Sequence, residues 1–278
     1  MKDTSLLEDA CERDNRTLSS LPEVTLAAVV AYDGSFFSGF ARQSQPHVVT
    51  IQGEIEHALS ILFRRSVLTT CAGRTDAGVH ALHQVVSFDL TKDEFSARSL
   101  DRLTSALNAL VDEHITISLI EERAPGFSAR FDAKAREYRY RIYTGVDRPV
   151  LISNLVWHIP HTKLDVEEMN KACTYLLGEH DFKSFCKAVS AVDKPTCRNI
   201  FELEFTHEII NSYEVLTMRV VGNAFLHSMV RTLAGTLVEV GKGNKPAHWA
   251  EEVLKAQDRS RAGQCAPAHG LIFWNVFY

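Results

Sequence analysis

The spacing of apolar residues predicts several helices along the chain. Between residues 51 and 63, apolar side chains recur at intervals of three or four, which places them on one face of a helix: Ile51, Ile55, Leu59 and Leu62. The same spacing returns at residues 100–110, 166–176 and 225–240. We therefore predict a helix in each of these segments.

Strand-like stretches lie between these helices. The continuous apolar run at residues 25–31 is typical of a buried central strand. Elsewhere apolar and polar residues alternate, which predicts strands with one buried face. The alternating or strand-like segments are 66–71, 84–89, 115–119, 136–143, 201–205, 216–220 and 271–278. Strands with interposed helices in both parts of the chain predict an α+β fold.

The chain divides into a polar tail and two parts of similar style. Residues 1–23 are polar and acidic, and we predict that they form a flexible N-terminal extension outside the fold. The length of 278 residues accommodates two modest domains or one large one. The segment 146–153, which contains Pro149, is a candidate boundary. We predict an N-terminal half at 24–147 and a C-terminal half at 148–278.

The composition is ordinary for a soluble globular protein, with 45% hydrophobic and 23% charged residues. No apolar run approaches the length that crosses a bilayer, and the first residues resemble neither a secretory signal nor a transit peptide. These features predict a cytoplasmic protein without a membrane segment. The six cysteines are widely spread and include no C-x-x-C pair. Cys71, His80 and His83 do not reproduce a zinc pattern, so we predict no metal.

Charge is unevenly distributed, although the formal net charge is only -5. A generic nucleic-acid binder tends to be basic. Residues 123–141, however, hold six basic and two acidic residues, interleaved with aromatic ones. A local basic stripe of this kind can bind phosphates on an acidic protein. The alternative interpretation is an ordinary solvated face.

The octapeptide GRTDAGVH at residues 73–80 lies between two strand-like runs. It places the carboxylate of Asp76 between two glycines, which permit close approach of the backbone and positive φ angles. Loops on a rigid scaffold often carry function. A solvated turn aspartate is the alternative, because Asp and Gly are common turn residues.

This octapeptide resembles the signature of the TruA-type tRNA pseudouridine synthases. Other motifs of that family follow in the same order between residues 24 and 278. They are YDGSFFSGF at 32–40, IQGEIE at 51–56, FSARF at 127–131, YRY at 138–140, GEHDF at 178–182 and NAFLHSMVR at 223–231. One departure is Ala41, which stands where the family commonly has glutamine.

The resemblance implies a fold and a reaction. The fold is the pseudouridine synthase fold, with two similar α+β halves whose sheets join around a central cleft. The reaction isomerises uridine to pseudouridine in the anticodon stem-loop of tRNA, at uridines 38, 39 and 40. It breaks the N1–C1′ bond and forms a C5–C1′ bond, and because nothing is oxidised and no group is donated, no cofactor is required. The family acts on tRNA as a homodimer.

The resemblance also assigns roles to individual residues. Asp76 is the catalytic carboxylate, and Arg231 is the arginine that pairs with it. Tyr138 stacks on the extruded uracil, and Arg74 helps to place the RNA. Without the resemblance, the favoured interpretation is a surface helix arginine for Arg231 and a half-buried strand tyrosine for Tyr138.

Several neighbouring residues receive lesser roles. Arg130 and Lys134 are candidates for contacts with RNA phosphates. His227 and Asn223 are expected to be structural, with a hydrogen bond to the octapeptide loop. Phe225 is expected, with Leu226, to form a wall of the cleft.

Two other functions stay open from the sequence. One is a non-catalytic module that binds structured RNA on the same fold. The other is a hydrolase that cleaves the glycosidic bond of free nucleosides, which would release free uracil. The nature of the product distinguishes all three functions.

Overall fold

The computed structural model describes residues 23–45, 47–187, 192 and 194–278. The predicted extension at 1–23 therefore lies almost entirely outside the described residues. Within them, ten strands form one sheet in the order β4-β1-β3-β10-β5-β9-β8-β7, with β2 beside β3 and β6 beside β5. The strands are β1 (Val24–Tyr32), β2 (Thr70–Cys71), β3 (His80–Leu90), β4 (Ile115–Arg123), β5 (Ala135–Tyr143), β6 (Trp157–His158), β7 (Gly178–Asp181), β8 (Cys197–Ile210), β9 (Tyr213–Gly222) and β10 (Leu271–Phe277).

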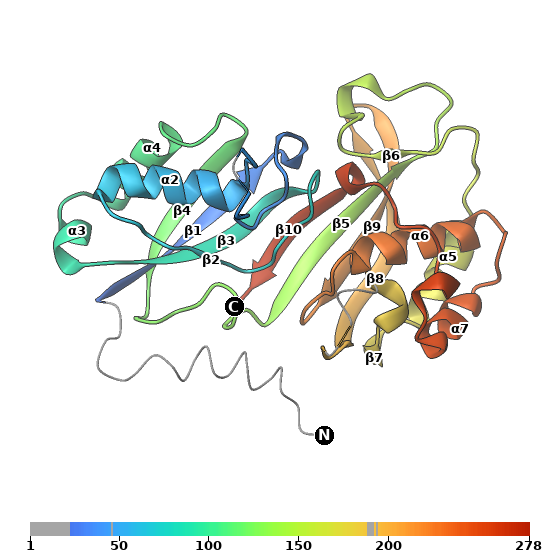
Figure 1. The fold of residues 1–278 in the computed structure, drawn as a ribbon. Helices are drawn as coiled ribbons and strands as arrows, with labels where there is room; N and C mark the ends of the chain where they lie inside the picture. Colours follow the sequence, from blue (N-terminus) through green and yellow to red (C-terminus); the bar gives the residue numbers. More distant parts are fainter. Residues whose placement is uncertain (1–22, 46, 188–191, 193) are drawn as a thin grey trace.

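Helices gather in two groups along this sheet (Figure 1). The first group is α2 (Ile51–Phe63), α3 (Lys92–Ser96) and α4 (Leu100–Asn108), near β4, β1 and β3. The second is α5 (Val166–Thr174), α6 (Met229–Gly241) and α7 (Trp249–Ala256), near β7, β8 and β9. None of the helices in the described part of the chain is long and apolar enough to cross a membrane.

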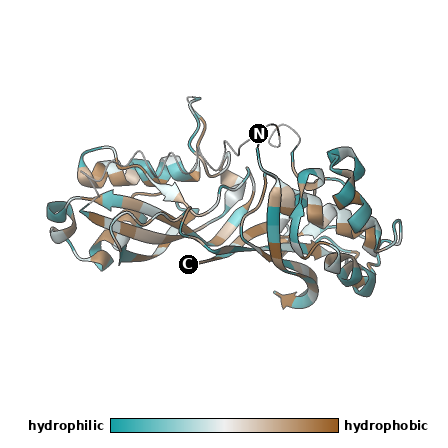
Figure 2. Ribbon diagram, turned by 90° about the horizontal axis from the view of Figure 1, so that it is seen from below, coloured by the Kyte–Doolittle hydropathy of each residue, from teal (hydrophilic) through white to brown (hydrophobic). Residues whose placement is uncertain are grey.

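The last strand of the chain lies in the middle of the sheet. β10 pairs in parallel with the start of β3, where Ile272 faces His80, and antiparallel with β5, where Phe273 faces Tyr138. It therefore places the end of the octapeptide and the strand that carries Tyr138 side by side. Figure 2 shows that the sheet continues from one group of helices to the other. Most buried apolar residues form one connected core that spans both parts of the chain.

The structure confirms the α+β fold and most predicted elements. The helix at 51–63 forms as expected: Thr50 caps it by accepting a hydrogen bond from the Gly53 N–H, and Ile51, Ile55 and Leu59 are buried. The division into halves at 147/148 stays a prediction, and the sheet is continuous across it, since β5 pairs with both β9 and β10.

Several boundaries differ from the prediction, and two of the differences lie next to the site. The strand expected at 66–71 forms only over β2, Thr70–Cys71. The helix expected from residue 225 begins at Met229, because a turn comes first: the Met229 N–H donates to the Leu226 carbonyl at 3.0 Å, and Ser228 has a φ of 60°. The residues before α6 are thereby freed from the helix, and they form one side of the site described next.

Candidate active site

The backbone around Asp76 is a fixed turn. The Val79 N–H donates to the Asp76 carbonyl at 3.2 Å, and Gly78 has a φ of +78°, as the third residue of a type II turn requires. Gly39 packs behind the turn, where an added Cβ would stand 3.2 Å from the Thr75 carbonyl oxygen. Because the main chain is held in this way, only the side chain of Asp76 is left to respond to its surroundings.

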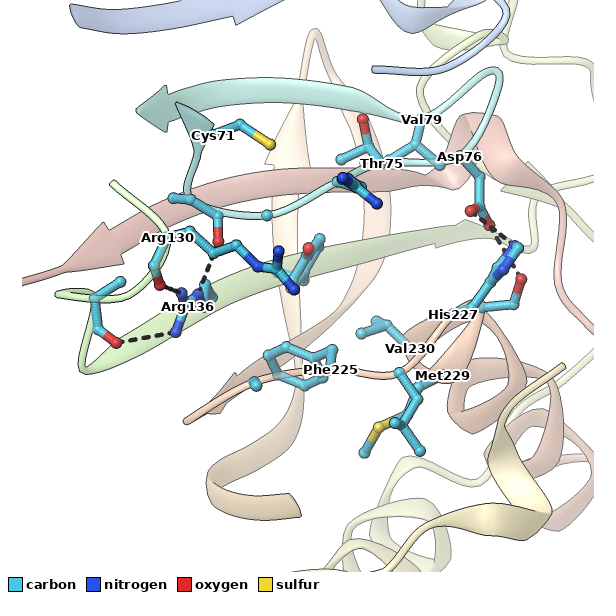
Figure 3. A pocket seen from close by; sticks show the side chains of 18 of the residues that line it. Cys71, Thr75, Asp76, Val79, Arg130, Arg136, Phe225, His227, Met229 and Val230 are labelled. Carbon is cyan, nitrogen blue, oxygen red and sulfur yellow. Dashed lines mark hydrogen bonds and ion pairs between the residues drawn. The ribbon is translucent and has the colours of Figure 1, made fainter. Parts of the chain in front are cut away.

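Within the described part of the chain, the hydrogen-bond and ion-pair partners of the Asp76 carboxylate come from one segment near the start of α6. Arg231 Nη1 donates to Oδ2 at 3.0 Å, and Ser228 Oγ donates to the same oxygen at 3.0 Å. His227 Nε2 lies 3.2 Å from Oδ1 (Figure 3). Both oxygens are thus engaged, and the direction of the carboxylate is set by the opposite side of the cavity.

Arg231 is itself fixed by the backbone. Its Nε donates to the Ala266 carbonyl at 2.8 Å, and the Ala266 N–H donates back to the Arg231 carbonyl at 3.1 Å. Its side chain is 19% exposed, against 28% for Asp76, so the pair is only partly shielded from water. The guanidinium therefore has one nitrogen anchored while another binds Asp76.

Tyr138 stands in an aromatic cluster beneath the same cavity. Its ring meets Phe225 at 5.1 Å and Phe273 at 4.9 Å between centroids, both edge to face. Burial raises the pKa of the Tyr138 phenol well above its ordinary value of 10.0. The hydroxyl consequently stays protonated near neutral pH and can donate a hydrogen bond.

The cavity that joins these residues has a volume of about 1000 Å³. Its charged lining is strongly basic, and among the described lining residues Asp76 is the only acidic one. The basic lining residues are Arg74, Arg130, Arg136, Lys194, Arg198, His227 and Arg231. A cationic cavity thus exists on a chain whose net charge is -5, and it attracts anionic ligands.

Arg136 is a residue that sequence reasoning missed. It is 8% exposed, and its guanidinium donates to the carbonyls of Ala72 at 3.1 Å, Ala133 at 3.0 Å and Asn223 at 2.7 Å. Burial lowers the pKa of this guanidinium from its ordinary value. Arg136 connects the octapeptide side, the loop before β5 and the segment before α6, so it holds three walls of the cavity together.

Of the other predicted residues, some line the cavity and others lie outside it or support the backbone. Arg74 is exposed and lines the cavity, as does Arg130, whose guanidinium lies 5.1 Å from the centre of the Phe131 ring. Lys134 is also exposed but does not belong to the lining. Asn223 supports the backbone, because its Oδ1 accepts from the Asn199 N–H at 3.0 Å.

His227 and Ser228 complete the set of residues around Asp76. His227 was expected to be structural, with a hydrogen bond to the octapeptide loop, and its ring does face the side chain of that loop's aspartate. Ser228 was not anticipated at all. Ser228 does belong to the motif NAFLHSMVR at 223–231, three residues before Arg231, but the apparently helical pattern of this segment gives no sign of its role.

A family model described as tRNA pseudouridine synthase matches residues 28–132 and 172–278. The chain belongs to this family. The tRNA pseudouridine synthase A of Anoxybacillus flavithermus is 41% identical over 256 residues, covering 91% of this chain and 98% of that protein. The synthases A of Bacillus subtilis and Francisella tularensis (strain SCHU S4 / Schu 4) are each 40% identical, over 255 and 250 residues and over 98% and 92% of their own lengths.

Membership in the tRNA pseudouridine synthase family confirms the resemblance seen in the sequence motifs. It makes the chain an enzyme of an isomerase family, which separates it from a non-catalytic module and from a hydrolase.

Proposed function

We propose that this chain converts uridine to pseudouridine in the anticodon stem-loop of tRNA, without a cofactor and with Asp76 as its catalytic carboxylate. One observation carries the proposal: a single carboxylate, fixed through both oxygens, stands in a cavity whose other charged lining residues are basic. The cations suit a polyanionic substrate, and the carboxylate supplies the one group that the isomerisation needs.

The cavity suits a nucleotide that has left its helix. A glycosidic bond inside a stacked stem is inaccessible, so the target must be extruded. The volume of about 1000 Å³ is at the upper end of ordinary ligand pockets, which run to roughly 1,000 Å³. The protonated Tyr138 offers a flat ring and a hydrogen-bond donor to the extruded uracil.

The reaction needs only local rearrangement inside this cavity. The N1–C1′ bond breaks while Asp76 assists covalently or electrostatically, and the freed uracil turns. The C5–C1′ bond then forms, C5 loses its proton and N1 gains one, so that substrate and product are isomers. Arg231 keeps the carboxylate oriented throughout. Walls contributed by both predicted halves, 24–147 and 148–278, enclose the base while it turns.

RNA binding is proposed to use the basic rim. Arg74 and Arg130 line the cavity and are exposed, so they can reach the phosphates beside the extruded nucleotide. Lys134 lies outside the lining and is proposed to contact a phosphate further along the RNA. A homodimer, in which one subunit grips the tRNA body while the other holds the target, and residence in the cytoplasm complete the proposal.

Product analysis tests the proposed function. Unmodified tRNA transcripts are incubated with the purified protein without added cofactor, and pseudouridine is mapped at single-nucleotide resolution while free uracil is quantified. Pseudouridine at the foot of the anticodon stem is the expected result. Free uracil would instead identify a hydrolase, and bound but unmodified tRNA would identify an RNA-binding module.

A further inference from the structure

Ser228 adopts a backbone conformation that serine normally avoids. Its φ of 60° and ψ of 12° lie in the left-handed region, where the Cβ of a non-glycine residue crowds the backbone. It is the third residue of the turn at 226–229, and turns with a positive φ at this position strongly favour Gly or Asn. A serine there is locally unfavourable.

The side chain of Ser228 is not used to stabilise its own helix. Ser228 occupies the N-cap position of α6, where a serine oxygen ordinarily accepts a hydrogen bond from the first turn, yet the described residues include no such bond. Its hydroxyl donates to Asp76 Oδ2 at 3.0 Å instead. The residue therefore forgoes both a favourable φ and a capping bond while it contacts Asp76.

The contact also joins Asp76 to the positive end of a helix. The first residues of α6, Met229, Val230 and Arg231, are apolar or basic, and the helix extends over 13 residues. The partial positive charge of a helix N-terminus attracts anions. Through Ser228, the Asp76 carboxylate is held beside the N-terminus of this helix.

We propose that Ser228 is a positioning residue that orients the Asp76 carboxylate, and that its left-handed conformation is maintained for this purpose. This inference rests on the proposed function. Oδ2 receives two donors, Ser228 and Arg231, from different points of the same segment. Without the hydroxyl, Arg231 on Oδ2 and His227 on Oδ1 remain, so the carboxylate loses one of its three contacts and its rotation about the Cβ–Cγ bond is less restricted. A small misplacement of a reacting group lowers the rate of the chemical step.

Three substitutions separate the hydroxyl from the backbone conformation. S228G removes the hydroxyl and relieves the positive φ, S228A removes the hydroxyl and keeps the strain, and S228N keeps a donor in a residue that tolerates the left-handed region. We expect kcat to fall about tenfold in both S228G and S228A, with KM unchanged, because each loses one bond to a charged group. S228N should recover most of kcat.

The melting temperatures of these variants should rank differently from their kcat values. S228G should melt about 2–4 °C above S228A, since only glycine relieves the strain. Ser212, with a φ of 70° and an exposed position in the turn between β8 and β9, provides the matched control. S212G should raise the melting temperature and leave kcat unchanged. If kcat followed the melting temperature rather than the hydroxyl, Ser228 would be merely structural and the positioning role would be wrong.

A double-mutant cycle, measured by thermal unfolding, tests the contact between Ser228 and Asp76 independently of catalysis. S228A should lower the melting temperature of the wild type by more than it lowers that of D76A, because only the wild type contains the hydrogen bond from Ser228 to the Asp76 carboxylate. Equal losses in both backgrounds would overturn the inference. If the wild type forms pseudouridine while S228G and S228A keep its kcat, the positioning role fails and the proposed function stands. If the wild type forms none, the proposed function fails, and the positioning role with it.

Discussion

Two turns of the same kind face each other across the cavity, and they differ at the residue with positive φ. The turn at 76–79 has Gly78 there, with a φ of +78°, and the turn at 226–229 has Ser228, with a φ of 60°. The first turn follows the conformational preference of its backbone, whereas the second departs from it. The first turn presents one carboxylate, and the second presents the hydroxyl and imidazole that bind it.

This difference separates two ways of building a site. The Asp76 turn is stabilised by its own surroundings: the Phe40 N–H donates to the Thr75 carbonyl at 3.1 Å, and the Tyr32 hydroxyl bonds Thr75 Oγ1 at 2.8 Å. In the opposite turn, the side chains of His227 and Ser228 contact the Asp76 carboxylate. We infer that the first turn can be disturbed mainly through its packing, and the second mainly through its charges and hydrogen bonds.

Apart from the loss of Asp76 itself, the largest effect is expected from removing Arg231, the cation that follows the second turn in α6. R231Q deletes the ion pair with Asp76 Oδ2 and leaves the Ala266 carbonyl without its donor. A hydrogen bond between charged groups contributes about 1.5–3 kcal/mol, which corresponds to a fall in kcat of about 10- to 150-fold. Single-turnover kinetics on a tRNA transcript measure this fall in the rate of the chemical step. R261Q, at an exposed arginine outside the cavity, is the control and should keep the wild-type rate.

The next largest effect is expected from changing the aromatic cluster beneath the cavity. Y138L keeps an apolar side chain and removes the flat ring that is proposed to stack on the extruded base. Stacking on an aromatic ring contributes about 1–3 kcal/mol per base, so kcat/KM should fall about 5- to 150-fold. A wild-type kcat/KM in a folded Y138L protein would contradict the stacking role.

A third change makes the first turn resemble the second. G78A places a Cβ on a residue with a φ of +78°, and that Cβ would stand 3.2 Å from the Cβ of Ala268. We expect a loss of about 1–2 kcal/mol in the free energy of unfolding, measured by urea denaturation. Because the carboxylate keeps its partners, kcat should fall less than in S228A. A larger fall in kcat in G78A than in S228A would show that catalysis depends more on the first turn than on the second.

The smallest effect concerns the anchor behind the first turn and depends on pH. Burial raises the pKa of the Tyr32 phenol above its ordinary value of 10.0. The folded state therefore retains this proton more tightly than the unfolded state does, so its contribution to stability is complete below pH 10 and is lost as pH rises further. Y32F should lose less stability than the wild type between pH 9 and pH 11 in urea titrations. Identical losses would exclude Tyr32 as a source of alkaline sensitivity.

The sequence predicts the first turn well and the second poorly, for a physical reason. Glycines on both sides of Asp76 mark a turn directly, and strand-like runs on both sides place it on the sheet. Before α6, by contrast, Phe225, Met229 and Leu233 keep helical spacing straight through the turn, and neither Gly nor Pro interrupts them. The helix start was therefore placed four residues too early, which concealed Ser228.

Long-range packing was equally hidden from the sequence. Nothing in the alternation of residues 271–278 indicates that this last strand lies between β3 and β5. The alternation of residues 136–143 places Tyr138 and Tyr140 on one face of a strand, and both are buried. The same alternation places Arg136 on the face of Tyr138 and Tyr140, but it could not predict that the guanidinium would bind carbonyls from three separate segments.

The most direct test of the central claim compares the wild type with D76N. Asparagine keeps the shape of the side chain and removes its charge, so the turn and tRNA binding should persist. D147N, at an exposed aspartate outside the cavity, controls for the loss of a negative charge. With equal tRNA affinity, we expect pseudouridine from the wild type and D147N and none from D76N. Pseudouridine formed by D76N at the wild-type rate would contradict the assignment of Asp76 as the catalytic carboxylate.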